Sequence, residues 1–190
     1  MSAILEAEAA RLTEQQRLDE LKTARERNKW GQFATPPALS FDIAKYAWHR
    51  LRRRKGEFAF LDPAIGTGSF FGAFLRAFPK HRIHRAVGIE LDKPFAETAR
   101  TIWRPQGLEV IQGDFTRQKP ATRFNLILTN PPYVRHHHLA TEDKQRLGEL
   151  AQEITGIRLS GLAGLYCYFL LVADAWLAED GLAAWLIPSE

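Results

Sequence analysis

Cysteine is nearly absent from this sequence, and no segment resembles a membrane anchor. A single cysteine, Cys167, excludes an internal disulfide and a zinc site built from cysteine pairs. No apolar run approaches the roughly 18 residues of a membrane span. The amino terminus, MSAILEAEAARLTEQQ, is acidic instead of basic and then apolar. We therefore expect a cytoplasmic protein with no signal peptide and no membrane partner.

Two common phosphate-binding signatures are missing as well. The segment 61–70, LDPAIGTGSF, places Gly66 and Gly68 between a predicted strand and a predicted helix, where the backbone can approach a ligand closely. The dinucleotide pattern needs a third glycine where Phe71 stands, and no Gly-Lys-Ser/Thr follows to make a P-loop. The sequence therefore disfavours a pyrophosphate ligand, and with it a nicotinamide or flavin cofactor.

The composition is that of one globular domain with a core. The chain has 190 residues, of which 45% are hydrophobic and 11% aromatic. The formal net charge is +4, and basic residues cluster at 49–55 and 80–85. Such clusters are either solvated helix ends and loops or a surface that faces phosphates. Both interpretations stay open from the sequence.

Strand and helix patterns alternate along the chain. Short apolar segments predict strands at 58–61, 86–90, 108–111, 124–129 and 182–187. Helices are predicted at 3–28, 37–51, 69–78, 93–103, from 141 onward and at 164–178. This order predicts a doubly wound α/β fold with a mostly parallel sheet, which binds ligands at the carboxyl ends of its strands. Residues 1–28 form a helical arm that packs on its own domain, 29–190, or on a partner.

An acidic residue follows each of the next two predicted strands. Glu90 lies about 20 residues past the glycine loop, where an acid can accept hydrogen bonds from ribose hydroxyls. Asp114 could accept from an adenine amino group while Phe115 covers the ring. Each acid alone could equally be a turn or cap residue. Together with the glycine loop they favour a nucleoside ligand without phosphates, such as S-adenosylmethionine.

These segments, in this order, resemble the gamma class of DNA amino-methyltransferases over residues 28–190. The matching motifs are 29–36 (KWGQFATP), 62–70 (DPAIGTGSF), Glu90, Asp114-Phe115 and Asn130-Pro131-Pro132-Tyr133. The resemblance implies a Rossmann-like class I methyltransferase fold, S-adenosylmethionine as cofactor and the N6 amine of DNA adenine as target. It also implies that the cofactor is bound by Phe33, Thr35, Pro36, Asp62, Ala64, Gly66, Gly68, Glu90, Asp114 and Phe115.

The same resemblance assigns catalysis to Asn130, Pro131, Pro132 and Tyr133. An exocyclic amine is a poor nucleophile because its lone pair is delocalised into the ring. The Asn130 side-chain carbonyl and the Pro131 backbone carbonyl can accept its two N–H bonds, in a turn that the prolines stiffen. Tyr133 offers a ring for stacking an adenine flipped out of the duplex. The alternative is that the two prolines merely end the fourth strand.

Other functions remain open. Glutamine methyltransferases of release factors and some RNA adenine methyltransferases use a similar Asn-Pro-Pro-aromatic element, but they usually lack a segment like 31–36. Cytosine-N4 enzymes more often carry serine at the position of Asn130. Three consecutive histidines, 136–138, rarely converge on one ion, so no metal is expected. They form either a DNA-facing loop or a solvated one.

The chain ends at 186–190, LIPSE, which resembles a motif at the end of the family's fifth strand. Family members continue with a β-hairpin and a target recognition region. We therefore expect a catalytic domain truncated after its fifth strand, acting with a restriction subunit or a missing carboxyl-terminal recognition domain. A non-catalytic cofactor-binding fragment of a larger assembly is the alternative. The isolated chain is expected to bind cofactor weakly and to methylate DNA poorly.

Overall fold

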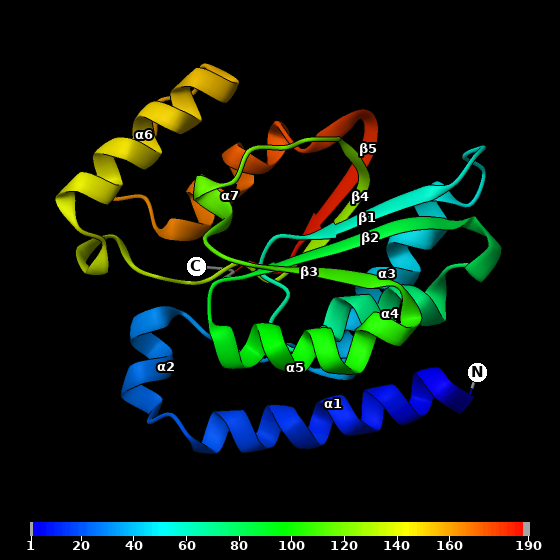
Figure 1. Ribbon diagram of the computed structural model, residues 1–190. Helices are drawn as coiled ribbons and strands as arrows, with labels where there is room; N and C mark the ends of the chain where they lie inside the picture. The colour runs from blue at the N-terminus through cyan, green and yellow to red at the C-terminus, as the bar shows by residue number, and fades with distance from the viewer. Residues whose placement is uncertain (1, 188–190) are drawn as a thin grey trace.

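A parallel sheet of five strands forms the centre of the molecule in a computed structural model that describes residues 2–187 (Figure 1). The strand order is β3-β2-β1-β4-β5, and every neighbouring pair is parallel. The strands are β1 (Phe58–Asp62), β2 (Ile83–Glu90), β3 (Leu108–Gln112), β4 (Phe124–Thr129) and β5 (Leu177–Trp185). Their apolar residues are covered on both faces, as in other parallel sheets.

Helices cover both faces of the sheet. On one face lie α3 (Pro37–Leu51), α4 (Ser69–Ala77) and α5 (Lys93–Trp103), whose core side chains pack with those of β1 and β2. The other face carries α6 (Thr141–Thr155) and α7 (Leu165–Asp174). Two further helices, α1 (Ser2–Glu20) and α2 (Ala24–Trp30), precede them. Figure 1 shows α1 as an outer layer beneath α5, and it contacts both α4 and α5.

Four 3-10 turns complete the described structure. They are η1 (Lys80–Arg82), η2 (Arg104–Gln106), η3 (Phe115–Arg117) and η4 (His136–His138). No helix among residues 2–187 is long and apolar enough to cross a membrane.

The predicted helix 3–28 is wrong in one respect, because α1 and α2 are separate helices. The chain turns at 21–23, and Thr23 is the residue directly before α2. The Thr23 hydroxyl accepts a hydrogen bond from the Glu26 backbone N–H at 3.2 Å, and the Glu26 carboxylate accepts from the Thr23 backbone N–H at 2.8 Å. This capping box starts a helix at a defined residue.

The predicted boundary between the last helix and the last strand is also wrong. The helix was expected to reach residue 178, but α7 ends at Asp174 and β5 already begins at Leu177. Leu177 pairs with Phe124, and the next paired residue, Leu182, lies opposite Leu126. Residues 178–181 therefore bulge out of the strand. Gly181 belongs to this bulge instead of ending a helix.

The strand order reverses at β1, which lies between β2 and β4. The chain goes from β1 to β2 on one side and places β4 on the other. In open α/β sheets this switch point opens a crevice at the carboxyl ends of the strands. The glycine loop follows β1 and the Asn-Pro-Pro segment follows β4, so the fold brings these two motifs together at this crevice.

Candidate functional site

One cavity of about 550 Å³ lies at the switch point. Its size is within the range of about 300–1,000 Å³ for small-molecule sites. The predicted site residues in its wall are Phe33, Thr35, Asp62, Ala64, Gly66, Glu90, Asp114, Phe115, Asn130 and Pro132. Segments separated by up to a hundred positions in the sequence therefore line one continuous space.

Glu90 ties the glycine loop to the end of β2. Its carboxylate accepts a hydrogen bond from the Gly66 backbone N–H at 2.9 Å and another from the Asp92 backbone N–H at 2.9 Å. Burial raises the pKa of Glu90, and these two backbone donors oppose the shift. Each carboxylate oxygen retains a lone pair for a further donor, so Glu90 can also accept from a ligand hydroxyl.

Asp62, at the end of β1, is only 1% exposed. It accepts a hydrogen bond from the Ala64 backbone N–H at 3.1 Å. Burial raises the pKa of Asp62 to about 7, although the hydrogen bond from the Ala64 backbone N–H favours the ionised form. The carboxyl group is therefore neutral in mildly acidic solution and ionised in alkaline solution. A cationic ligand group in the cavity would draw it towards the ionised form.

This raised pKa predicts a pH dependence of folding stability that Asp62→Asn removes. An unfolded aspartate titrates near pH 3.8, whereas the folded one titrates near 7. The folded state binds the extra proton, so the free energy of unfolding falls as pH rises through this window. At pH 8 the variant should be more stable than the parent by a few kcal/mol, since one pKa unit corresponds to about 1.4 kcal/mol. At pH 4 the two should be nearly equal.

Urea unfolding between pH 4 and pH 8 measures this effect. Asp42→Asn is the matched control, because the Asp42 side chain is 66% exposed and pairs only with Lys45 on the same helix. Its unfolding curves should follow those of the parent at every pH. Parallel pH profiles for Asp62→Asn and the parent would show that Asp62 is already ionised in the folded protein near neutral pH.

Asn130, directly after β4, has its amide fixed in one orientation. The Nδ2 group donates to the Phe33 carbonyl oxygen at 2.9 Å and to the Thr35 hydroxyl at 3.1 Å. The Oδ1 atom is buried and has no hydrogen-bond partner among the described residues. A buried acceptor without a donor is unfavourable by about 1–3 kcal/mol. Such a group indicates a site kept ready for a donor that arrives with a ligand.

The chain around Tyr133 packs directly on Gly31. The Tyr133 backbone N–H donates to the Gly31 carbonyl oxygen at 3.2 Å, and the hydroxyl donates to the Leu186 carbonyl oxygen at 2.7 Å. The ring stacks on Phe33 with centroids 5.8 Å apart and an interplanar angle of 29°. Tyr133 is therefore held by three contacts from two segments that are distant in the sequence.

Asp114 combines a structural contact with a place in the cavity wall. Its Oδ1 atom accepts from the backbone N–H of Thr116 at 2.8 Å and from its hydroxyl at 2.7 Å, which caps η3. Its Oδ2 atom lies 3.3 Å from Nε of Arg117 and 3.9 Å from Nη2 of Arg146. Asp114 is therefore a cap residue through its Oδ1 atom, as the alternative interpretation of the sequence expected. Adenine recognition by the other oxygen stays a prediction.

Phe115 is nearly fully buried at the edge of the cavity. Its ring packs against Phe169 and Trp176, with centroid distances of 5.1 and 5.4 Å. These contacts hold the ring in one place in the wall. The prediction that it covers an adenine ring is not tested by them.

Four predicted site residues do not line the cavity wall: Pro36, Gly68, Pro131 and Tyr133. Pro36 is the residue before α3, and Gly68 precedes α4, where it lies against the indole of Trp103. Pro131 is buried beneath the turn. These residues shape the backbone around the cavity, while Asn130 and Pro132 face it.

Several wall residues were missed by sequence reasoning. Gln15 and Asp19 come from α1, and Asp143 and Arg146 come from α6. The Arg146 guanidinium donates to the Thr116 carbonyl at 3.1 Å and to its hydroxyl at 3.1 Å, which holds α6 against the Asp114 loop. The acids in the first turn of α6 indicate the start of a helix and only weakly indicate a binding site. The sequence of α1 has no such acids in its first turn and gave no indication that Gln15 and Asp19 line a cavity.

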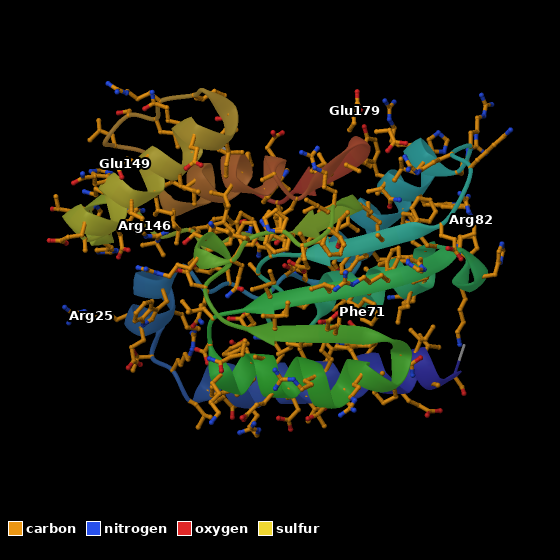
Figure 2. All side chains as sticks on the ribbon, turned by 45° about the horizontal axis from the view of Figure 1, so that its top comes forward. Arg25, Phe71, Arg82, Arg146, Glu149 and Glu179 are labelled. Atoms are coloured by element: carbon orange, nitrogen blue, oxygen red, sulfur yellow. The ribbon has the colours of Figure 1, made fainter. Side chains whose placement is uncertain are left out.

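The basic clusters lie at the far end of the sheet from the cavity. Residues 49–55 end α3 and precede β1, and residues 80–85 enter β2, so both border the amino ends of the strands. Figure 2 shows Arg82 at this end and Arg146 at the opposite end. Arg82 donates to the Gly56 carbonyl oxygen and lies over the Phe58 ring, so one member has a structural role.

The three histidines of η4 pack on one another, with centroids 5.3 Å apart for His136–His137 and 4.3 Å for His137–His138. Within residues 2–187, no group of three or more His, Cys, Asp or Glu side chains is placed to hold a metal ion. His138 also borders the cavity.

The fold is that of class I S-adenosylmethionine-dependent methyltransferases. A Listeria monocytogenes protein assigned to that class superposes with a TM-score of 0.67 at 17% identity, covering 84% of this chain and 47% of that one. The methyltransferase subunit of a type I restriction-modification system from Streptococcus thermophilus gives a TM-score of 0.63 at 18% identity, covering 81% and 34%. The predicted fold is confirmed, and the class that shares it depends on S-adenosylmethionine, in agreement with the predicted cofactor.

Two of the relatives found by sequence comparison are type II methyltransferases. The chain is 28% identical over 165 residues to the type II methyltransferase M.AccI of Acinetobacter calcoaceticus, covering 86% of this chain and 29% of that protein. It is 32% identical to the type II methyltransferase M.XamI of Xanthomonas campestris pv. amaranthicola, covering 68% and 25%. The chain therefore spans less than a third of the length of these two relatives. No family model matches it.

Relatives with other substrates match as well. A tRNA1(Val) (adenine(37)-N6)-methyltransferase of Actinobacillus pleuropneumoniae is 30% identical, covering 66% of this chain and 50% of that protein. The release factor glutamine methyltransferase of Agrobacterium fabrum is 32% identical, covering 67% and 44%. The chain is thus similar to S-adenosylmethionine-dependent methyltransferases that act on more than one kind of substrate.

Proposed function

We propose that this chain is the catalytic domain, residues 29–190 with the helical arm, of an S-adenosylmethionine-dependent DNA methyltransferase. Its target is the N6 amine of an adenine flipped out of the duplex. The observation that carries the proposal is the Asn130 amide, whose Nδ2 group is held by the Phe33 carbonyl and Thr35. The buried Oδ1 atom has no hydrogen-bond partner within residues 2–187, and Asn130 shares one cavity with the glycine loop.

The residues present fit S-adenosylmethionine. Glu90 has lone pairs for the ribose hydroxyls, and Asp62 offers a carboxylate to the methionine end, where a cationic ammonium group would hold it ionised. Gly66 and Ala64 line the same wall, so backbone comes close to the ligand. The cavity of about 550 Å³ accepts a ligand of this size.

Asn130 prepares the amine for attack. Its Oδ1 atom accepts one N–H bond of the target amine, which favours the tetrahedral geometry that the attacking nitrogen adopts. The second acceptor that the family resemblance implies is the carbonyl oxygen of Pro131, a residue that lies outside the cavity wall. When bound, S-adenosylmethionine supplies a methyl group on a positively charged sulfur. That methyl group would leave its sulfur for the nitrogen of the target amine, and the surplus proton of the amine would pass to water. Preorganised acceptors and proximity supply the catalysis, with no general base at the outset.

The choice of DNA is supported by the extent of the sequence match. The alignment with M.AccI extends over 86% of the chain, whereas those with the tRNA and release factor enzymes extend over 66% and 67%. The segment 31–36 also carries Phe33 and Thr35, which orient Asn130. Similarity to type II enzymes further supports a restriction nuclease, or a recognition region in a longer protein, as the partner.

Methyl transfer from tritiated S-adenosylmethionine tests the proposal. Unmethylated genomic DNA, rRNA, tRNA and release factor are offered in parallel, to this chain and to the longest reading frame that contains it. Label in N6-methyladenine of DNA is expected. Label in RNA would instead indicate an RNA adenine methyltransferase, and label in a glutamine of the release factor would indicate a protein glutamine methyltransferase. Tight cofactor binding with no label in any substrate would favour a non-catalytic fragment.

Gly31→Ala is expected to lower the rate of methyl transfer by at least about tenfold, because small displacements of reacting groups can reduce rates by up to about a hundredfold. Gly31 has φ +61°, and a Cβ atom there would lie 2.3 Å from the Tyr133 backbone nitrogen and 2.6 Å from its carbonyl carbon. Both partners are backbone, so the Asn-Pro-Pro-Tyr turn itself must move. Single-turnover kinetics with saturating cofactor measures the effect.

Gly56→Ala is the matched control. Gly56 also has a positive φ, +86°, but nothing lies within 4 Å of the added Cβ. Both variants bear the strain of an alanine in this region, about 1–2 kcal/mol, and both should lower the melting temperature. If the two lose activity equally, the close approach of Gly31 to Tyr133 has no catalytic importance.

A further inference from the structure

Three buried polar side chains and the partly buried Glu8 connect α1 to the glycine loop. Arg11 and Thr67 are 1% and 2% exposed, and Gln15 is 9% exposed. The Arg11 Nη1 group donates to the Thr67 hydroxyl at 3.2 Å, and that hydroxyl donates to Gln15 Oε1 at 2.7 Å. Glu8 completes the network as the partner of Arg11. The Thr67 hydroxyl therefore uses both its donor and an acceptor position on α1.

Each member of this network is oriented by a further contact. Glu8 accepts from Arg11 Nε at 2.8 Å and from Nη2 at 2.6 Å, which neutralises the buried charge in a two-point pair. Gln15 Nε2 donates to Asp19 Oδ1 at 3.0 Å, so the Gln15 carbonyl oxygen points to Thr67. The network carries no net charge from its buried ion pair. The network therefore acts on the glycine loop by fixing the position of Thr67, and not by placing a charge beside it.

Thr67 is held from the opposite side by α5. Its carbonyl oxygen accepts a hydrogen bond from the Trp103 indole N–H at 2.9 Å. Gly72, one turn into α4, allows this close packing, since a Cβ there would lie 2.9 Å from Glu8 Oε2 and 2.9 Å from the Trp103 ring. The one residue between the two loop glycines is thus fixed through its side chain by α1 and through its backbone by α5.

A second connection joins the end of α1 to the rest of the cavity wall. Lys22 pairs with Asp92, just beyond Glu90, and donates to Gln32 Oε1 at 2.7 Å. Gln32 Nε2 donates to Asp92 at 3.2 Å. The arm therefore contacts the glycine loop, the loop after β2 and the segment that orients Asn130. Gln15 and Asp19 also line the cavity directly.

We propose that α1 is a working part of the cofactor site, in which Arg11 and Gln15 are positioning residues. They hold Thr67, and with it the Gly66–Gly68 turn, in the conformation that receives S-adenosylmethionine. This inference rests on the proposed cofactor. It assigns a role to an arm in which the sequence alone shows no chemistry.

Gln15→Leu and Thr67→Val test the inference, because each removes the Thr67–Gln15 hydrogen bond with little change in volume. Calorimetry should show the Kd for S-adenosylmethionine rising about tenfold in each, equivalent to about 1.4 kcal/mol. The kcat at saturating cofactor should change less than about twofold, as expected when only binding is weakened. In the cofactor-free protein, amides of residues 65–69 should exchange hydrogen faster than in the parent.

Two further variants make the test specific. Gln16→Leu changes the exposed neighbour of Gln15 on the same helix and should leave Kd and exchange unchanged. Thr67→Ser keeps the hydroxyl and should restore most of the affinity lost in Thr67→Val. The double variant Gln15→Leu/Thr67→Val should weaken binding less than the sum of the two single changes.

The outcomes separate this inference from the proposed function. A lower melting temperature for Gln15→Leu with unchanged Kd and unchanged exchange would overturn the positioning role and leave α1 as general support. If the parent itself binds no S-adenosylmethionine, the proposed function fails. Hydrogen exchange in the free protein then still decides whether α1 holds the loop: faster exchange supports it, and unchanged exchange overturns it.

Discussion

Replacing Asn130 with alanine is expected to lower the rate of methyl transfer by at least about a hundredfold, the scale seen when one preorganised group is removed from an active site. The change deletes the buried Oδ1 acceptor that has no partner within the described chain. It also removes the hydrogen bonds from Nδ2 to Phe33 and Thr35. The cofactor Kd should rise only about threefold, the effect of a modest hydrogen-bond loss.

The matched control for this variant is Asn125→Ala, near the start of β4, the strand that Asn130 follows. Asn125 Oδ1 accepts from the Ala59 backbone N–H at 3.0 Å, and its Nδ2 donates to the Glu57 carbonyl oxygen at 3.0 Å. It makes comparable bonds at the opposite end of β4. Rapid-quench single turnovers at saturating cofactor should show a loss of rate for Asn130→Ala alone. A rate within threefold of the parent would remove Asn130 from the chemistry.

Glu90→Ala should raise the Kd for S-adenosylmethionine by about a hundredfold, through loss of charge-assisted hydrogen bonds each contributing about 1.5–3 kcal/mol. Two effects combine in this estimate. The ribose hydroxyls lose their acceptor, and the Gly66 and Asp92 backbone N–H groups lose theirs. Because burial already raises the pKa of Glu90, removing the carboxyl group also relieves a desolvation penalty. Folding stability should therefore fall less than affinity does.

Calorimetric titration with S-adenosylmethionine measures this change, with Glu97→Ala as control. Glu97 lies exposed on α5 and pairs only with Lys93, at 3.7 Å. Glu90→Gln is informative as well, because it keeps one acceptor oxygen and replaces the other with a donor facing a backbone N–H. The affinity of Glu90→Gln for S-adenosylmethionine should lie between that of the parent and that of Glu90→Ala. Unchanged affinity for Glu90→Ala would mean that the ribose binds elsewhere.

Elements with strong local signals were predicted to the residue. The bounds of α3, α5 and β4 agree with the expected 37–51, 93–103 and 124–129. Pro37 begins the first of these helices, and a buried apolar run defines the strand. The break after α1 had a local signal too, in Thr23 and Glu26. The end of α7 had none, because the pairing of Leu177 with Phe124 overrides an apolar pattern typical of a helix.

The residues of the candidate site also fall into two groups, those that the sequence predicted and those that it did not. Motifs next to strand ends, such as the glycine loop and Asn130, were predictable because a parallel sheet brings carboxyl ends together. The orientation of the Asn130 amide was not, since it depends on Phe33 and Thr35. The contribution of Gln15 was also hidden, because it depends on how α1 docks. The thin apolar stripe of that helix predicted that it packs on another surface, but it did not indicate which surface.

The hydrogen bonds that orient Asn130 join residues 97 and 95 positions apart, and the Tyr133 hydroxyl reaches across 53 positions to Leu186. The Asn-Pro-Pro-Tyr turn therefore has high contact order, and closing such long loops is entropically unfavourable until the sheet exists. On the ribosome, Phe33, Thr35, β1 and the glycine loop all emerge well before Asn130 and Leu186. The nascent chain thus acquires the proposed cofactor-binding loop before it acquires the proposed catalytic turn.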